Sequence, residues 1–281
     1  MKRPLAAGAR LASTNVYTRG GTRVVDLRDV AWVDPVHLVS VAAAAEAAHR
    51  EGLGFRLRGP ADPGRSRYAS RMRLGEMVAA VGGTHDLPGV TDTDRSEHLV
   101  EVGRLETPSD VHRLATLAYN RAAEVDAALA HALHQGVAEI GQNVCDHACS
   151  VGFVAAQTIP RRGELRFAVA DPGVGLLATL RGQGAESDRH AIELALAGVS
   201  RSGRRGTGLL QTLRAVTRLG GYFYIASGLS AATVTARRHV SSRGPDFLGT
   251  LVEGRVPTRR PVRGTMDVRA SEGGGQRDEP G

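Results

Sequence analysis

An apolar stripe in the segment 121–150 is the feature that most constrains the fold. Its residues recur at intervals of three and four positions, which is the spacing of one face of an α-helix. They are Leu133, Val137, Ile140, Val144, Ala148 and Val151. The pattern predicts one long helix over about 121–150 that packs this face against a core.

A polar strip lies beside the apolar stripe on the same predicted helix. Glu139, Asn143 and His147 follow one another at four-residue intervals, so each drifts only about 40° around the helix from the one before. They could form a solvated edge, or they could hold a metal ion and a reacting water. Asn143 favours the second reading, because asparagine is a mediocre helix former and has no cap to make in the middle of a helix.

Two cysteines, Cys145 and Cys149, share a face of this helix. His147 would lie about 160° around the helix from Cys145, so the three side chains do not converge on one metal ion. Two cysteines are too few for a disulfide framework. The sequence favours small buried thiols in a reduced, cytoplasmic compartment.

Charge and hydropathy exclude several classes of protein. The net charge is +7, but the arginines are spread along the chain and only one lysine is present. A nucleic-acid binder would cluster its basic residues on one face or in a run interleaved with aromatics, so nucleic-acid binding is not favoured. The chain has no run of 18 apolar residues and no continuous apolar segment near its start, so we expect neither a membrane span nor a signal peptide.

Composition along the chain predicts two domains joined by a linker. The boundaries are a flexible leader at 1–22, a small α/β domain at 23–83, a linker at 84–96, a larger domain at 97–257 and a disordered tail at 258–281. In the first domain, a strand at 24–27 and an apolar run at 30–33 precede a helix for which Asp34 is the expected N-cap. A strand, "GFRLRGP", and a helix, "SRYASRMRLGEMVAAVGG", complete it.

The larger domain mixes both periodicities. A strand, "EHLVEVGRL", leads into a helix that opens at Thr107, and the long helix follows. Next come a strand in "GELRFAVADPGVG", a short helix in "DRHAIELALAG" and a helix in "TGLLQTLRAVTRLGG". Three strands then close the domain, "YFYIASG", "AATVTARR" and "GTLVEGRVP". The fold class predicted is therefore α/β (α+β).

Two glycine motifs in the larger domain are candidates for ligand contact. Asp171 ends an apolar strand and is followed by Gly173 and Gly175, which let the backbone pass close to a ligand. "RGTGLL" places Gly206, Thr207 and Gly208 before a helix, where exposed backbone N–H groups suit phosphate. Each motif alone could be a plain turn, and neither the complete Rossmann nor the complete P-loop pattern occurs.

The order of these motifs resembles the GHKL ATP-binding fold of gyrase, histidine kinases and MutL. "EIGQNVCDHA" is similar to the N box, "DPGVG" to the first glycine box, "RRGTGLL" to the second, and Gly249–Thr250 to the closing Gly-Thr. The resemblance covers about 97–257. It implies a two-layer α/β sandwich that binds ATP and Mg²⁺.

The resemblance also implies roles for the polar residues of these motifs. Asn143 would coordinate Mg²⁺, for which an amide oxygen is a suitable hard ligand. Glu139 would be the general base in a hydrolysing or phosphate-transferring enzyme. Asp171 would accept a hydrogen bond from the adenine amino group, selecting adenine over guanine.

The glycines of the same motifs would shape the nucleotide site. Gly173 and Gly175 would lie against the base and ribose. Gly206, Thr207 and Gly208 would bring backbone amides to the phosphates, and Thr250 would lie near the base. Arg201, Arg204 and Arg205 could reach phosphate or form a solvated run.

The first domain, over 22–83, resembles a STAS domain, and any other small α/β domain is the alternative. STAS domains of anti-anti-sigma factors carry a phosphorylatable hydroxyl where this chain reads Asp34-Pro35-Val36-His37. Val36 stands at the acceptor position, so we expect no phosphorylation there. No paired helices with an acceptor histidine precede residue 97, so the ATP domain resembles that of anti-sigma-factor serine kinases more closely than a two-component sensor.

Three functions remain open on the sequence. The first is an ATP-dependent protein serine kinase or slow ATPase of the anti-sigma type. The second is a non-catalytic switch in which ATP binding orders residues 176–205. The third, resting on charge alone, is a DNA-bound factor. The first two functions imply three partners: ATP, a regulatory protein such as a STAS protein or sigma factor, and a second copy of the chain.

Overall fold

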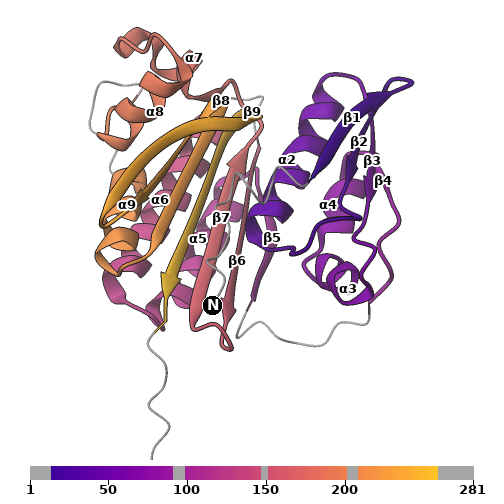
Figure 1. Ribbon diagram of the computed structural model, residues 1–281, viewed down its shortest axis with the longest axis horizontal. Coiled ribbons are helices and arrows are strands. Elements are labelled where there is room, and N and C mark those ends of the chain that lie inside the picture. The colour runs from indigo at the N-terminus through magenta and orange to yellow at the C-terminus, as the bar shows by residue number, and fades with distance from the viewer. Residues whose placement is uncertain (1–13, 91–98, 147–150, 201–207, 259–281) are drawn as a thin grey trace, which may run out of the picture.

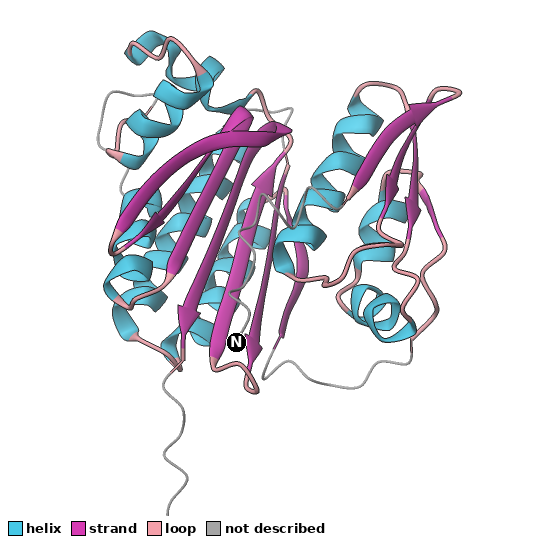
Figure 2. Ribbon diagram, viewed as in Figure 1, coloured by secondary structure: helices cyan, strands magenta, loops and turns pink. Residues whose placement is uncertain are grey.

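The computed structural model describes residues 14–90, 99–146, 151–200 and 208–258, with side chains in the second range described up to residue 139. The fold is mixed α/β, as predicted, and contains two sheets (Figures 1 and 2). In Figure 1 the larger sheet stands on the left with α5, α6 and α9 behind it, and the smaller sheet stands on the right. Helix α2 lies between the two sheets.

The smaller sheet has the strand order β1-β2-β3-β4. Its strands are β1 (Asn15–Arg19), β2 (Thr22–Asp26), β3 (Gly54–Arg58) and β4 (Thr84–His85). The pair β1–β2 is antiparallel and the other two pairs are parallel. Its helices are α2 (Pro35–Arg50), α3 (Pro63–Arg71) and α4 (Leu74–Ala80).

Three sequence predictions for this unit need correction. Residues 15–19, predicted as leader, form β1, and residues 84–85, predicted as linker, pair with β3. The apolar run 30–33, for which no helix or strand was predicted, is a loop whose Val30 and Val33 are buried. The single helix predicted in "SRYASRMRLGEMVAAVGG" is two helices, because Arg73 adopts a left-handed φ of 62° between them.

The larger sheet has the order β5-β6-β7-β9-β8, and every neighbouring pair is antiparallel. Its strands are β5 (Leu99–Leu105), β6 (Gly152–Ile159), β7 (Glu164–Asp171), β8 (Tyr222–Thr235) and β9 (Arg238–Pro257). The sequence missed β6. It also predicted three closing strands where β8 and β9 form one long hairpin.

The helices of the larger unit are α5 (Pro108–Ala123), α6 (Ala127–Asp146), α7 (Gly175–Leu180), α8 (Asp188–Leu196) and α9 (Gly208–Arg218). Helix α5 starts with a capping box in which Thr107 and Asp110 satisfy each other's backbone N–H. The long helix predicted over 121–150 is wrong at its start. Helix α5 ends at Ala123, and Asp126 accepts the Leu129 N–H at 2.9 Å to begin α6.

The larger sheet buries both of its faces because its side chains alternate between two cores. Leu165, Phe167 and neighbouring residues pack against α5, α6 and α9. Ala168, Ala170 and Leu251 belong to a core shared with α2 and the smaller sheet. Alanines on α2 and on the sheet let helix and strands approach closely. The smaller unit thus covers the face of the larger sheet opposite α5, α6 and α9.

Candidate functional site

Asp171 is the last residue of β7, and its carboxyl is surrounded by hydrogen-bond donors. Its Oδ1 accepts the backbone N–H of Gly173 at 2.9 Å. Thr250 lies opposite in β9 and also hydrogen-bonds to the carboxyl. Burial raises the pKa of Asp171 above the usual range, and these hydrogen bonds oppose that rise because they favour the carboxylate. A carboxylate offers about four acceptor positions, so this one retains capacity for a donor from a ligand.

Two glycines make the close approach at this strand end achievable. Gly249 has a φ of +94°, and a Cβ there would collide with the carbonyl oxygen of Asp171. Gly175 has a φ of +78°, and a Cβ there would lie 2.9 Å from the Ser227 Oγ. Neither backbone conformation suits a residue with a side chain. The structure therefore brings the predicted residues Asp171, Gly175 and Thr250 together with Gly249.

Ser227 is a residue of this cluster that the sequence analysis missed. Its hydroxyl donates to the Gly249 carbonyl at 2.8 Å and accepts the Leu176 N–H at 2.9 Å. It thereby joins β8, β9 and the start of α7. The available signal was a polar residue within the apolar run "YFYIASG", directly before a glycine.

Glu139 and Gly208 form a second cluster where α6 crosses α9. The Glu139 Oε2 accepts the Gly208 N–H at 2.6 Å. Gly208 is the first residue of α9, so the carboxylate lies at the positive end of that helix, where an anion is stabilised. A Cβ at Gly208 would lie 3.0 Å from the Gly136 Cα. The helix crossing therefore accounts for this glycine without any ligand.

A small apolar core connects the two clusters. Leu176 follows Gly175, Leu209 follows Gly208, and both pack against the buried cluster of Leu180, Ala185, Ala191 and Ala195. This cluster lies in the range 176–205, which was predicted to hold one short helix. The described part of that range contains most of α7, a 3-10 turn at Arg181–Gln183, and α8. Its Asp188 accepts the Leu229 N–H of β8 at 2.8 Å.

Other predicted site residues lie beyond what the structure describes. Asn143 belongs to α6, one helical turn after Glu139, but its side chain is outside the described set. Gly206, Thr207 and His147 are outside the described residues altogether, as are the arginines at 201, 204 and 205. A role for Asn143 as a Mg²⁺ ligand thus stays a prediction.

The start of α2 carries a buried polar network where the sequence predicted a degenerate STAS acceptor. Val36 is fully buried. Asp34 was predicted as a helix cap. Its carboxylate hydrogen-bonds with the Nδ1 of His37 at 2.9 Å and accepts a hydrogen bond from the Nη1 of Arg166, in β7, at 2.9 Å. Tyr68 donates to Gln157 at 2.8 Å nearby, and burial raises the pKa of its phenol well above the usual range. The network joins the two units.

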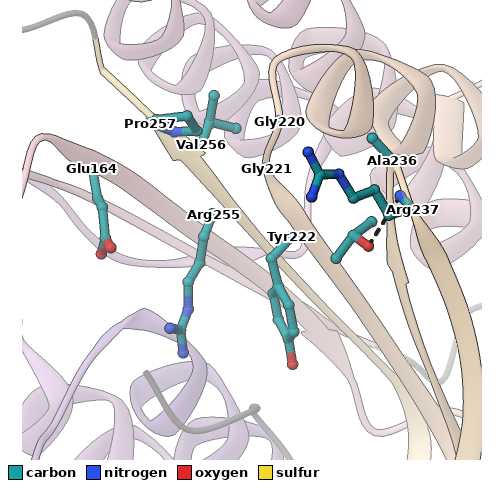
Figure 3. Close-up of a pocket in the computed structure, with 10 residues that line it drawn as sticks. Glu164, Gly220, Gly221, Tyr222, Ala236, Arg237, Arg255, Val256 and Pro257 are labelled. Atoms are coloured by element: carbon teal, nitrogen blue, oxygen red, sulfur yellow. Dashed lines mark hydrogen bonds between the residues drawn. The ribbon is translucent and has the colours of Figure 1, made fainter. Parts of the chain in front are cut away.

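A cavity lies at the other end of β7. It has a volume of about 580 Å³ and touches Glu164, the first residue of that strand. Seven residue steps separate Glu164 from Asp171, which corresponds to about 23 Å of extended chain. Figure 3 shows Tyr222 and Arg255 beside each other in its wall, with the guanidinium 5.3 Å from the ring centre. The cavity is separate from the Asp171 and Glu139 clusters.

Comparisons with models of protein families, with curated proteins and with solved structures find no match to this chain. Within the part of the chain that the structure describes, no helix is long and apolar enough to cross a membrane. Among the same residues, no three His, Cys, Asp or Glu side chains gather as a metal site would require.

Proposed function

We propose that this protein binds Mg-ATP in the manner of a histidine-kinase-like ATPase and regulates a protein partner. The observation that carries the proposal is the pairing at one strand end of Asp171 with Gly173 and Thr250, beside the turn that Gly175 and Gly249 allow. These are the residues to which the resemblance assigns adenine recognition, and they come from segments nearly 80 positions apart.

The residues present suit the two chemical demands of the ligand. Asp171 supplies a carboxylate with spare acceptor capacity for an exocyclic amine. The N-terminus of α9 supplies a backbone N–H at Gly208 that already holds an anionic group, the Glu139 carboxylate. Mg²⁺ held by Asn143 would supply charge neutralisation for the phosphates.

The test is a calorimetric titration of the full chain with ATP, with and without Mg²⁺. We expect binding that strengthens with Mg²⁺ in the wild type, and loss of that Mg²⁺ dependence in Asn143→Ala. Asp29→Asn, an exposed carboxylate substitution far along the sequence from both clusters, is the control and should titrate like the wild type. Absence of any ATP binding to the wild type would overturn the proposal.

A second candidate, a non-catalytic ATP-gated switch, is favoured by the hydrogen bond of Glu139. The Glu139 carboxylate accepts the Gly208 N–H at 2.6 Å and so joins α6 to α9, a structural role that requires no proton transfer. In the switch, nucleotide would act by displacing Glu139 from the amide and moving α9. In the kinase or slow ATPase, the acceptor positions that the Gly208 N–H leaves open on the Glu139 carboxylate would take the proton.

Glu139→Gln separates the two candidates. The amide oxygen of glutamine still accepts the Gly208 N–H, but glutamine cannot take a proton from water. A kinase or ATPase would lose about 10²-fold or more of its turnover, measured as phosphate release or transfer to a protein, while keeping its ATP affinity. If the wild type binds ATP and shows no turnover with any partner, the enzyme is excluded and the switch remains.

A further inference from the structure

Helix α2 of the smaller unit runs alongside β7 from one end to the other. Near its start, the Asp34 carboxylate forms an ion pair with Arg166, the third residue of β7, with 2.9 Å between Oδ2 and Nη1. At its last residue, Arg50 donates from Nη1 to the carbonyl of Pro172, just past the strand, at 2.9 Å. A helix of 16 residues is about 24 Å long, and six strand residues span about 20 Å. Helix and strand therefore match in length and direction.

The contact of Arg50 falls on one peptide unit of the Asp171 loop. The carbonyl of Pro172 accepts from Arg50, and the N–H of the same peptide, which belongs to Gly173, donates to the Asp171 Oδ1 at 2.9 Å. A peptide group is planar and rigid, so fixing its carbonyl also fixes the direction of its N–H. Arg50 and Asp171 thus bind the two ends of the same peptide group, Arg50 at its carbonyl and Asp171 at its N–H.

Electrostatics adds to this geometry. The positive charge of Arg50 lowers the pKa of Asp171 and so opposes the effect of burial. One residue of the smaller unit therefore acts on both the orientation and the charge of the carboxylate that belongs to the larger unit.

We propose that Arg50 is a positioning residue for Asp171, so that adenine recognition by the larger unit depends on the docking of α2 through this single peptide plane. The inference rests on the proposed ATP function, but its structural part does not require nucleotide. Without Arg50, the carbonyl side of the 172–173 peptide loses the hydrogen bond that fixes it, and the Asp171 carboxylate on the other side is oriented less tightly.

The experiment compares Arg50→Ala and Arg50→Lys with Arg23→Ala as the matched control. Arg23 also sits on the smaller unit and pairs with Glu51, the residue next to Arg50, at 2.8 Å. Lysine at position 50 keeps the positive charge at the end of α2 and one donor for the Pro172 carbonyl. Each variant is measured as the full chain, first by hydrogen exchange without nucleotide and then by ATP and GTP titration.

We expect exchange at the Gly173 amide to rise about 3- to 10-fold in Arg50→Ala, the range that the loss of one hydrogen bond gives. ATP affinity should fall by a similar factor and GTP affinity should change less, since the change is in adenine recognition. Arg50→Lys should recover part of both effects, and Arg23→Ala should match the wild type. A general loss of folding would instead raise exchange throughout the larger sheet.

The outcomes separate this inference from the proposed function. Unchanged Gly173 exchange in Arg50→Ala overturns the positioning role, whatever the wild type binds. Faster exchange with unchanged ATP affinity overturns the dependence of adenine recognition on α2. If Gly173 exchanges faster in Arg50→Ala but the wild type binds no ATP, the positioning role of Arg50 is retained and the proposed function is rejected.

Discussion

Two opposed effects act on the pKa of the Asp171 carboxyl. Burial favours the neutral acid, while Gly173, Thr250 and Arg50 favour the carboxylate, and the net effect is a pKa above the usual range. The carboxylate is the form with acceptor capacity for an adenine amino group. Asp171 therefore becomes protonated at a pH where an exposed aspartate stays ionised, and ATP affinity should depend on pH in that range.

The first prediction is that ATP affinity falls on acidification, beginning at a higher pH than the titration of an exposed aspartate allows. Because the pKa of Asp171 is raised, its acceptor is present above that pKa and lost as the pH falls through it. Asp171→Asn should bind ATP about 10- to 100-fold more weakly, the range for a hydrogen bond to a charged group. Titrations across a pH series, with ATP protonation measured separately, check both results.

Asp29→Asn should keep the wild-type pH profile. If Asp171→Asn loses affinity but keeps the same pH dependence as the wild type, the titrating group is another residue. If it binds as tightly as the wild type, Asp171 does not recognise the base.

At the scale of elements, α6 and α9 cross at two glycines. A Cβ at Gly208 would meet the Glu139 Oε2 at 2.7 Å and backbone atoms of Gln135 and Gly136 at 3.0 Å. Thr212, one turn further along α9, hydrogen-bonds to the carbonyl of Ala132 at 3.0 Å. Backbone atoms cannot rotate away, so the close crossing depends on the absence of a side chain.

The second prediction is that Gly208→Ala destabilises the fold by about 1–3 kcal/mol, the usual cost of inserting a methyl group into a packed contact. Denaturant unfolding measures the change in the free energy of unfolding. Gly182→Ala is the control, since a Cβ there would face open space as far as the described residues show. Equal stability of the two variants would mean that the helices do not approach as closely as the structure places them.

The sequence predicted the elements whose signals are local. The Asp34-Pro35 start located α2, the helix start at Thr107 located α5, and the segment "TGLLQTLRAVTRLGG" located α9. It missed β6 because "GFVAAQTI" is buried on both faces and lacks alternation. It missed the break before α6 because the residues between the two helices, 124–126, include no glycine or proline, and Asp126 caps the next helix.

The candidate site shows the same division between local and distant information. Motif order brought Asp171 and Thr250 into one prediction. Ser227 and Arg50 could not be found in that way, because each contributes through a backbone contact made only after distant segments pack. The Glu139–Gly208 bond also needed the crossing angle of two helices, which residue spacing does not contain.

At the scale of the whole molecule, α2 explains why the two units share a core. A helix that packs one face carries one apolar stripe, whereas a helix that is apolar all round is buried on all sides. Twelve of the 16 residues of α2 are buried, from Pro35 to Ala48. Its run of valines and alanines was therefore a sequence signal for a helix between two layers, and it argues that the two units unfold together.

Trp32, the single tryptophan of the chain, reports on this junction. It stands in the loop before α2, and the Arg162 guanidinium from the β6–β7 turn lies 4.5 Å from its ring centre. Separation of the units would remove that cation–π contact and change the surroundings of the indole. Far-ultraviolet circular dichroism reports instead on the helices and strands of both units.

The third prediction is that Trp32 fluorescence and circular dichroism follow one denaturation curve with the same midpoint and slope. One transition is expected because the core around α2 includes Ala168, Ala170 and Leu251 of the larger sheet, so neither unit keeps its buried surface without the other. A fluorescence midpoint at clearly lower denaturant would show that the units part before they unfold. In that case Arg50 would leave Pro172 in an otherwise folded protein, and the Asp171 loop would lose its support while the larger sheet stayed intact.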